Sequence, residues 1–203
     1  LESEVSLLTI GSLTNPRGGH GDMPRVPFHT GNTLGASPSM FRQFCGDIGL
    51  RKEVADRVCD GPNGFNVGRL TKWAEDYTST YVSMGLCIRP IITRSINLKE
   101  LSELYLAATG LEMSPAQLME AGERVFNVLK AFNVKAGAKR RDDMPPAWPP
   151  DKPLVMEGKE YGTLDQILNQ YYDERGWDVH SGIPTRKKLT ALGLESIADD
   201  IAV

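Results

Sequence analysis

Residues 114–134 read SPAQLMEAGERVFNVLKAFNV, and this stretch decides the fold class. Ser114 can cap a helix, Pro115 suits the first helical position, and Gln117 stands where the partner in a capping box belongs. The stretch therefore predicts a helix that begins at Pro115. Apolar side chains that should face the core recur through it at helical spacing: Leu118, Ala121, Val125, Val128, Leu129 and Phe132.

Gly122 lies inside this predicted helix. A glycine in a helix interior costs about 1 kcal/mol relative to alanine. We therefore expect another segment to pack closely against the helix at this position.

The chain on the N-terminal side of this stretch carries two more helix signals. Apolar residues at helical spacing predict a helix over residues 68–84, and Gly85 is a natural stop for it. Asn97 and Glu100 form a second capping box, which predicts a helix that ends at Gly110. The inward face of that second helix is expected to hold Leu98, Leu101, Leu104, Tyr105 and Ala108.

On the C-terminal side, Thr163 with Gln166 predicts another helix start, and Thr185 predicts a last short helix. Between them and the opening stretch, residues 144–153 read MPPAWPPDKP. Residues before proline are disfavoured in helices, so this segment should be an extended connector.

Residues 11–67 are rich in Gly, Pro, Asn and Ser, and we expect loops there apart from one short helix between Phe41 and Cys59. We find no internal repeat and no convincing run of strands. The predicted fold class is all-α, with an irregular helical architecture.

The composition narrows the function classes. The chain has 203 residues and a net charge of -3, which disfavours a nucleic-acid or anionic-membrane surface. Its three cysteines, Cys45, Cys59 and Cys87, cannot pair completely as disulfides and contain no C-x-x-C pair. A reducing, cytoplasmic setting follows. Because an iron–sulfur cluster takes four thiolates, any such cluster must draw ligands from elsewhere.

Three places hold residue types that can perform chemistry. Residues 15–20 (NPRGGH) combine a flexible backbone, the guanidinium of Arg17 and the titratable ring of His20, although a glycine-rich turn with a surface histidine would look the same. Cys87 follows a helix stop; an isolated cysteine is most often a buried apolar residue, and a metal ligand is the alternative. Residues 172–178 (YDERGWD) most simply form a helix end with a salt-bridged corner.

Five segments in order resemble signatures of the aldehyde:ferredoxin oxidoreductase family, and the resemblance covers most of residues 11–200. They are an RGG-x-H-type loop at 15–20, the end of a D-x-x-G-L-C motif at 85–87, a G-E-R…F-N helix at 122–134, a D-D-x-x-P segment at 141–145, and a closing segment between 171 and 194.

The resemblance implies an oxygen-sensitive enzyme that oxidises aldehydes to carboxylic acids and passes the electrons to ferredoxin. Its cofactors would be tungsten, or molybdenum, held by two pterins, together with a [4Fe–4S] cluster. Residues 1–67 would be the loop-rich end of the second, helical domain, and residues 68–203 the C-terminal helical domain. The N-terminal domain that cradles the pterins is absent from the chain, so the chain alone should be inactive.

The resemblance also assigns roles to residues. Cys87 would be the fourth ligand of the [4Fe–4S] cluster. The turn of Ser83, Gly85 and Leu86 would line the second pterin and offer backbone N–H groups. Within residues 15–20, Arg17 would bind the cofactor, and His20 would lie near the metal as a proton donor or acceptor.

The implied partners are ferredoxin, a small aldehyde and the N-terminal remainder of the same protein; neither nucleic acid nor membrane is expected, and a homodimer is compatible with the sequence. Two departures keep alternatives open. Val82 stands where the family motif has an acid that binds the pterin, and we expect an insertion within residues 26–62. The alternatives are a relative with another substrate, such as an aromatic thioester reductase subunit, and a non-catalytic helical scaffold.

Overall fold

The computed structural model describes residues 38–47, 49–60, 64–86, 95–143, 151, 153–156 and 158–203. They form a mostly helical fold, which confirms the predicted all-α class. The elements are α4 (Pro38–Asp47), α5 (Lys52–Cys59), α6 (Val67–Ser83), α8 (Leu98–Thr109), α9 (Pro115–Lys135), the 3-10 helix η2 (Arg140–Asp143), β1 (Pro153–Met156), β2 (Lys159–Thr163), α10 (Leu164–Arg175), α11 (Arg186–Ala191) and α12 (Glu195–Asp200).

The helix starts lie where the sequence predicts them. Asn97, Ser114 and Thr163 each accept a backbone N–H of the first helical turn, and each completes its capping box. Thr185 caps α11 in the same way without a box. None of the described helices has the length and apolar character needed to cross a bilayer.

Two local expectations were wrong. The single short helix expected between Phe41 and Cys59 is two helices, because backbone bonds from Gly49 and Leu50 back to Gly46 and Cys45 close α4 before α5 begins. A two-stranded antiparallel hairpin, β1–β2, leads into α10 where no strand was expected. Most of the expected connector at 144–153 lies outside the described residues.

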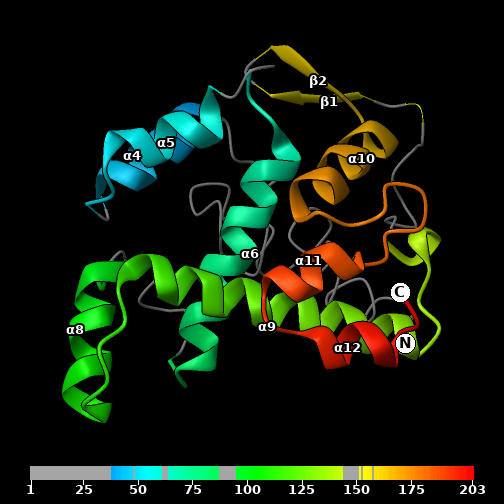
Figure 1. The fold of residues 1–203 in the computed structure, drawn as a ribbon. Coiled ribbons are helices and arrows are strands. Elements are labelled where there is room, and N and C mark those ends of the chain that lie inside the picture. The colour runs from blue at the N-terminus through cyan, green and yellow to red at the C-terminus, as the bar shows by residue number, and fades with distance from the viewer. Residues whose placement is uncertain are drawn as a thin grey trace.

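Helix α6 is central to the packing. Figure 1 shows it crossing α9, with α8 at one end of α9 and with α11 and α12 along the other half. One hydrophobic cluster joins α6 to α4, α5 and the first turns of α8 and α9. A second cluster joins the N-terminal end of α6 to α9 and α10.

Gly122 marks the closest approach of α9 to α6. A Cβ atom built on Gly122 would lie 2.2 Å from the carbonyl oxygen of Asp76 and 2.4 Å from Oγ1 of Thr80. The Thr80 hydroxyl also donates to the carbonyl oxygen of Leu118 on α9, at 2.9 Å. The close contact expected from the sequence is thus confirmed, and its partner is the backbone of α6.

The buried face of α9 differs from the predicted apolar stripe. Leu118 is buried as expected, but Val128 and Leu129 are partly exposed and Phe132 is 67% exposed. The buried face instead carries the polar side chains of Asn127, Lys130 and Asn133. Asn127 bonds to Trp177 and Lys130 to Asp143, whereas Nδ2 of Asn133 has no partner among the described residues. Hydrophobicity alone therefore assigns the wrong side to the second half of the helix.

The same correction applies to α8. Only Leu98 and Leu101 of its predicted inward face are buried, whereas Leu104 is 51% exposed and Ala108 is exposed. The helix packs through its first turns, and the described residues leave its far end uncovered.

Arg175 is fully buried and joins α10 to α6. Its guanidinium donates to Oε2 of Glu75 at 2.7 Å and to Oδ1 of Asp76 at 2.5 Å. The hydroxyl of Tyr171 also donates to Oε2 of Glu75, at 2.6 Å, while Oε1 of Glu75 has no hydrogen-bond partner among the described residues. Burial raises the pKa of Glu75 from 4.5 to about 7, against the opposing effect of the guanidinium.

Gly122→Ala should destabilise the chain by about 2–3 kcal/mol, because the added methyl group meets the backbone of α6 and overpacking outweighs the gain in helix propensity. Gly46→Ala in α4 is the matched control, since its Cβ would meet nothing within 4 Å. That variant should be neutral or slightly stabilising. Urea unfolding followed by circular dichroism measures both, and equal stability of the two variants would contradict the packing described.

Glu75→Gln should remove a pH dependence of stability. Because the pKa of Glu75 is raised in the folded chain, its favourable contribution is complete below pH 4.5 and is lost as the pH rises to about 7. Wild type should lose up to about 3 kcal/mol relative to the variant across this window. Glu103→Gln changes an exposed carboxylate and should keep the wild-type profile. Parallel profiles for wild type and Glu75→Gln would show that Glu75 titrates normally.

Candidate functional site

The end of α6 forms the turn that precedes Cys87. The N–H of Gly85 donates to the carbonyl oxygen of Val82 at 3.0 Å, and the N–H of Leu86 donates to that of Tyr81 at 3.1 Å. This pair of bonds is a Schellman motif, which requires a left-handed residue, and Gly85 has a φ of +74°. The stop predicted at Gly85 is confirmed.

The backbone N–H groups that were expected to face the pterin form hydrogen bonds within the turn itself. The N–H of Met84 donates to the carbonyl oxygen of Tyr81, so Met84, Gly85 and Leu86 all bond to the last turn of their own helix. The N–H groups at this turn are therefore engaged within the chain. Contacts with a cofactor here would have to come from side chains or carbonyl oxygens.

Two buried tyrosines of α6 lie next to the turn and form hydrogen bonds there. The hydroxyl groups of Tyr77 and Tyr81 lie 3.0 Å apart, and that of Tyr81 also donates to the carbonyl oxygen of Ile96 at 2.6 Å. Burial raises the pKa of both tyrosines, so both remain protonated donors at neutral pH. The bond to Ile96 ties the end of α6 to the segment that begins α8.

The outer surface of the turn is open but carries no acid. Val82 is 55% exposed, and Ser83 is exposed while its hydroxyl donates to the carbonyl oxygen of Ser79 at 2.6 Å. A pterin ring that met this surface would find an isopropyl group where the family motif has a carboxylate. The described part of the turn thus does not fit the family's pterin contact, and we assign no reaction step to it.

The predicted site residues divide into two sets. Ser83, Gly85 and Leu86 are neighbours in the turn just described. Arg17, His20 and Cys87 lie outside the described residues. The structure therefore gives no distance between the turn and Arg17, His20 or Cys87. The range 26–62 of the expected insertion is described in part and there holds α4 and α5.

The other two cysteines behave as core residues. Cys45 and Cys59 are free thiols buried in the larger hydrophobic cluster. Burial raises the pKa of Cys45 to about 12 and also raises that of Cys59, so neither supplies a thiolate at neutral pH. No group of three or more His, Cys, Asp or Glu side chains suited to a metal ion occurs among the described residues.

Sequence reasoning missed a buried polar cluster at the far end of α9. Lys130 Nζ lies 2.6 Å from Oδ2 of Asp143, and the hydroxyl of Tyr172 donates to the same oxygen. Lys130 and Asp143 are almost completely buried. The D-D-x-x-P resemblance pointed to Asp143, but nothing in the periodicity of α9 marks Lys130 as its partner. The salt-bridged corner expected at residues 172–178 is confirmed through Arg175 and through Glu174, which pairs with Arg69 at 2.7 Å.

Comparison with known proteins gives consistent results. A tungsten-containing aldehyde ferredoxin oxidoreductase of Pyrococcus furiosus is 33% identical over 124 residues, which are 59% of this chain and 20% of that protein. The corresponding protein of Thermococcus kodakarensis is 30% identical over 124 residues, again 20% of its length. The matched part thus spans about a fifth of these relatives.

A solved structure shares the fold. It is the active-site complex of benzoyl coenzyme A reductase with 1,5-dienoyl-CoA, matched with a TM-score of 0.58 and 22% identity over 81% of this chain and 26% of that chain.

Residues 6–194 match the family described as aldehyde ferredoxin oxidoreductase, domains 2 and 3. This match covers nearly the whole chain and contains the α6 turn, the Gly122 helix and the Arg175 corner. The chain therefore belongs to the aldehyde ferredoxin oxidoreductase family, of which it represents domains 2 and 3.

Proposed function

We propose that the chain is the C-terminal helical part of a tungsten-pterin, [4Fe–4S] oxidoreductase. The reaction would convert an aldehyde and water into a carboxylic acid, with two protons and two electrons released and the electrons passed to ferredoxin. The observation that carries this proposal is the family match over residues 6–194, which includes the helix end before Cys87. The tungsten-containing relatives support the choice of metal.

In this proposal Cys87 is the fourth ligand of the cluster, and its other three ligands come from the N-terminal remainder of the protein. Arg17 and the turn of Ser83, Gly85 and Leu86 would lie against the pterins, and His20 would exchange a proton with the substrate oxygen. With Val82 beside it, the turn would contribute packing rather than a charged contact.

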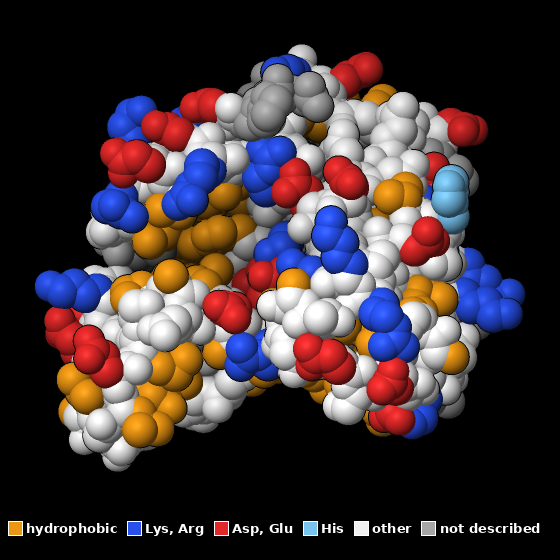
Figure 2. All heavy atoms as spheres, in the orientation of Figure 1, with side chains coloured by type: hydrophobic (Ala, Val, Ile, Leu, Met, Phe, Trp, Pro, Cys, Tyr) orange, Lys and Arg blue, Asp and Glu red, His pale blue; other side chains and the backbone are white. Residues whose placement is uncertain are grey.

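The exposed apolar side chains support a role for the remainder of the protein as a partner. Val82, Leu104, Leu111 and Phe132 are each at least 45% exposed. They lie on α6, on α8, in the connection between α8 and α9, and on α9, respectively. Figure 2 shows hydrophobic side chains gathered over the face of the molecule where α8 lies. Burial of such surface against an N-terminal domain would remove it from water.

The division of the chain into residues 1–67 and 68–203 is part of the same proposal, as is a cytoplasmic location. The free thiols Cys45 and Cys59 support a reducing compartment.

A relative with a different substrate is the second candidate, and Val82 is the observation that favours it. A changed pterin contact would alter how the cofactor is held. Aldehydes with ferredoxin and an aromatic coenzyme A thioester, offered to the same preparation, distinguish the two activities. A full-length protein with neither tungsten nor iron would leave only the non-catalytic scaffold.

Cys87→Ser in the full-length gene product, purified without oxygen, should lose a ligand to the cluster. The expected result is a reduced iron content, an altered electron paramagnetic resonance spectrum and loss of aldehyde-dependent ferredoxin reduction. Cys59→Ala is the matched control: it removes a buried thiol and should keep the full [4Fe–4S] complement with a modest loss of stability. An unchanged cluster spectrum and iron content in Cys87→Ser would overturn the assignment of this ligand.

A further inference from the structure

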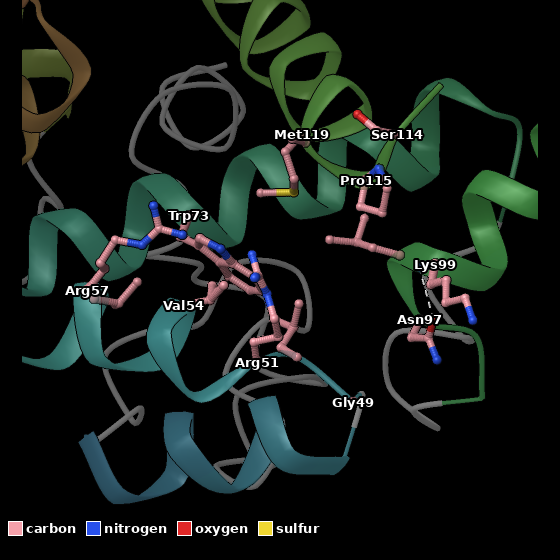
Figure 3. Close-up of a pocket in the computed structure, with 14 residues that line it drawn as sticks. Gly49, Arg51, Val54, Arg57, Trp73, Asn97, Lys99, Ser114, Pro115 and Met119 are labelled. Carbon is pink, nitrogen blue, oxygen red and sulfur yellow. Dashed lines mark hydrogen bonds between the residues drawn. The ribbon is translucent and has the colours of Figure 1, made fainter. Parts of the chain in front are cut away.

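A cavity of about 680 Å³ opens between α5, α6 and the beginnings of α8 and α9 (Figure 3). This volume lies in the range of about 300–1,000 Å³ that is usual for small-molecule sites. Ser83, Gly85 and Leu86 do not line it. The inference drawn from this cavity is therefore independent of the proposed enzymatic function.

One side of the cavity is apolar, and aromatic packing holds its largest side chain in place. Trp73 and Met119 contribute large apolar surfaces to the lining. The ring of Trp73 stacks on that of Tyr77, with centroids 4.9 Å apart and planes at 14°, and meets Phe41 edge to face at 5.3 Å. These contacts hold the indole in place, so a ligand would meet a preformed apolar wall.

The remaining charge in the lining is all positive. It comes from Arg51, Arg57 and Lys99, and no Asp or Glu is among the described residues that line the cavity. Neither Arg51 nor Arg57 forms an ion pair with a described residue, and Lys99 has only Glu103 at 3.7 Å. In Figure 3 the two arginine side chains extend from α5 toward Trp73.

These cations are unusual for this chain. It carries a net charge of -3, and four other arginines form ion pairs at 2.5–2.7 Å, namely Arg42, Arg69, Arg140 and Arg175. Within the described part of the chain, no carboxylate pairs with the guanidinium groups of Arg51 and Arg57, although a carboxylate is the partner that their planar donors suit.

Three helix N-termini lie at the cavity. Residues at the starts of α5, α8 and α9 all line it, among them Arg51, Leu98 and Pro115. Asn97 and Ser114 cap the starts of α8 and α9, so the uncapped start of α5 is the one that adds to the positive field. At α5 the N-cap is Arg51, whose side chain forms no capping hydrogen bond, so no side-chain oxygen satisfies the first N–H groups there.

We propose that this cavity binds a small organic carboxylate, with the charged group held by Arg51 and Arg57 and the apolar body against Trp73 and Met119. The apolar wall requires a hydrocarbon or aromatic body, which an inorganic anion lacks. The cationic side and the uncapped start of α5 favour an anion, which a neutral hydrocarbon lacks. A carboxylate with an aryl or short alkyl body meets both requirements.

The test is titration calorimetry of the full chain with 3-phenylpropionate, its neutral amide and inorganic phosphate. The acid should bind at least tenfold more tightly than the amide, and its affinity should fall as salt is added. Phosphate alone should bind weakly and should not displace the acid at equal concentration. No binding of the acid up to about 10 mM, or equal affinity of acid and amide, would overturn the proposal.

Variants locate the site. The double variant Arg51→Gln with Arg57→Gln should weaken binding of the acid at least tenfold. The control double variant Lys139→Gln with Arg141→Gln removes the same charge from exposed positions outside the lining and should bind nearly as wild type. Equal affinities of the two double variants would show that the arginines of α5 do not hold the anion.

Ala116→Glu is an independent test that should not harm the fold. Ala116 is exposed, lines the cavity and lies in the first turn of α9, where a carboxylate suits the helix dipole. The new carboxylate should repel the ligand and weaken binding of the acid at least fivefold. Undiminished affinity in this variant would also overturn the proposal.

Discussion

The guanidinium of Arg175, held between Glu75 and Asp76, is the interaction on which the helical packing depends. It is fully buried, and its plane lies over the ring of Phe126 with Cζ 4.2 Å from the centroid. One side chain of α10 thereby contacts both α6 and α9. A buried charge that loses its partner costs several kcal/mol. Moving α10 away from α6 would leave Arg175 in this state, so the contact opposes separation of these helices.

Further ion pairs surround this contact. Lys72 of α6 lies 2.9 Å from Asp76 and 3.0 Å from Glu123 of α9, and Lys188 of α11 lies 2.5 Å from the same Glu123. The network therefore extends from α10 through α6 and α9 to α11. Beside it, Gly122 permits the backbones of α6 and α9 to meet. Together these contacts fix the direction of α6 and the position of its final turn.

The sequence allowed the helix starts to be predicted because capping is local. Asn97, Ser114 and Thr163 each find their partner within three residues, so no tertiary information is needed. The faces of α8 and α9 could not be predicted in the same way. Lys130 is buried only because Asp143, 13 residues away, meets it, and Phe132 is exposed although its hydrophobicity favours burial. Whether such side chains are buried depends on residues that are distant in the sequence.

The candidate site likewise has features that follow from the local sequence and features that depend on the folded structure. The stop at Gly85 follows from a short-range rule and was predicted, whereas the engagement of the neighbouring N–H groups depends on the full geometry of the turn. The cavity beside Trp73 gave no sequence signal, because Arg51, Lys99 and Pro115 come from separate helices. The starts of α5, α8 and α9 meet at this cavity only because α6 and α9 cross in the folded chain.

In the function proposed above, the chain is a helical part that supplies one cluster ligand, Cys87, while the remainder of the protein supplies the others. The iron content of the isolated 203-residue chain, after anaerobic treatment with iron and sulfide, tests this most directly when set beside that of the full gene product. We expect a complete [4Fe–4S] cluster in the full product and no stoichiometric cluster in the isolated chain. A stoichiometric [4Fe–4S] spectrum from the isolated chain would contradict this expectation.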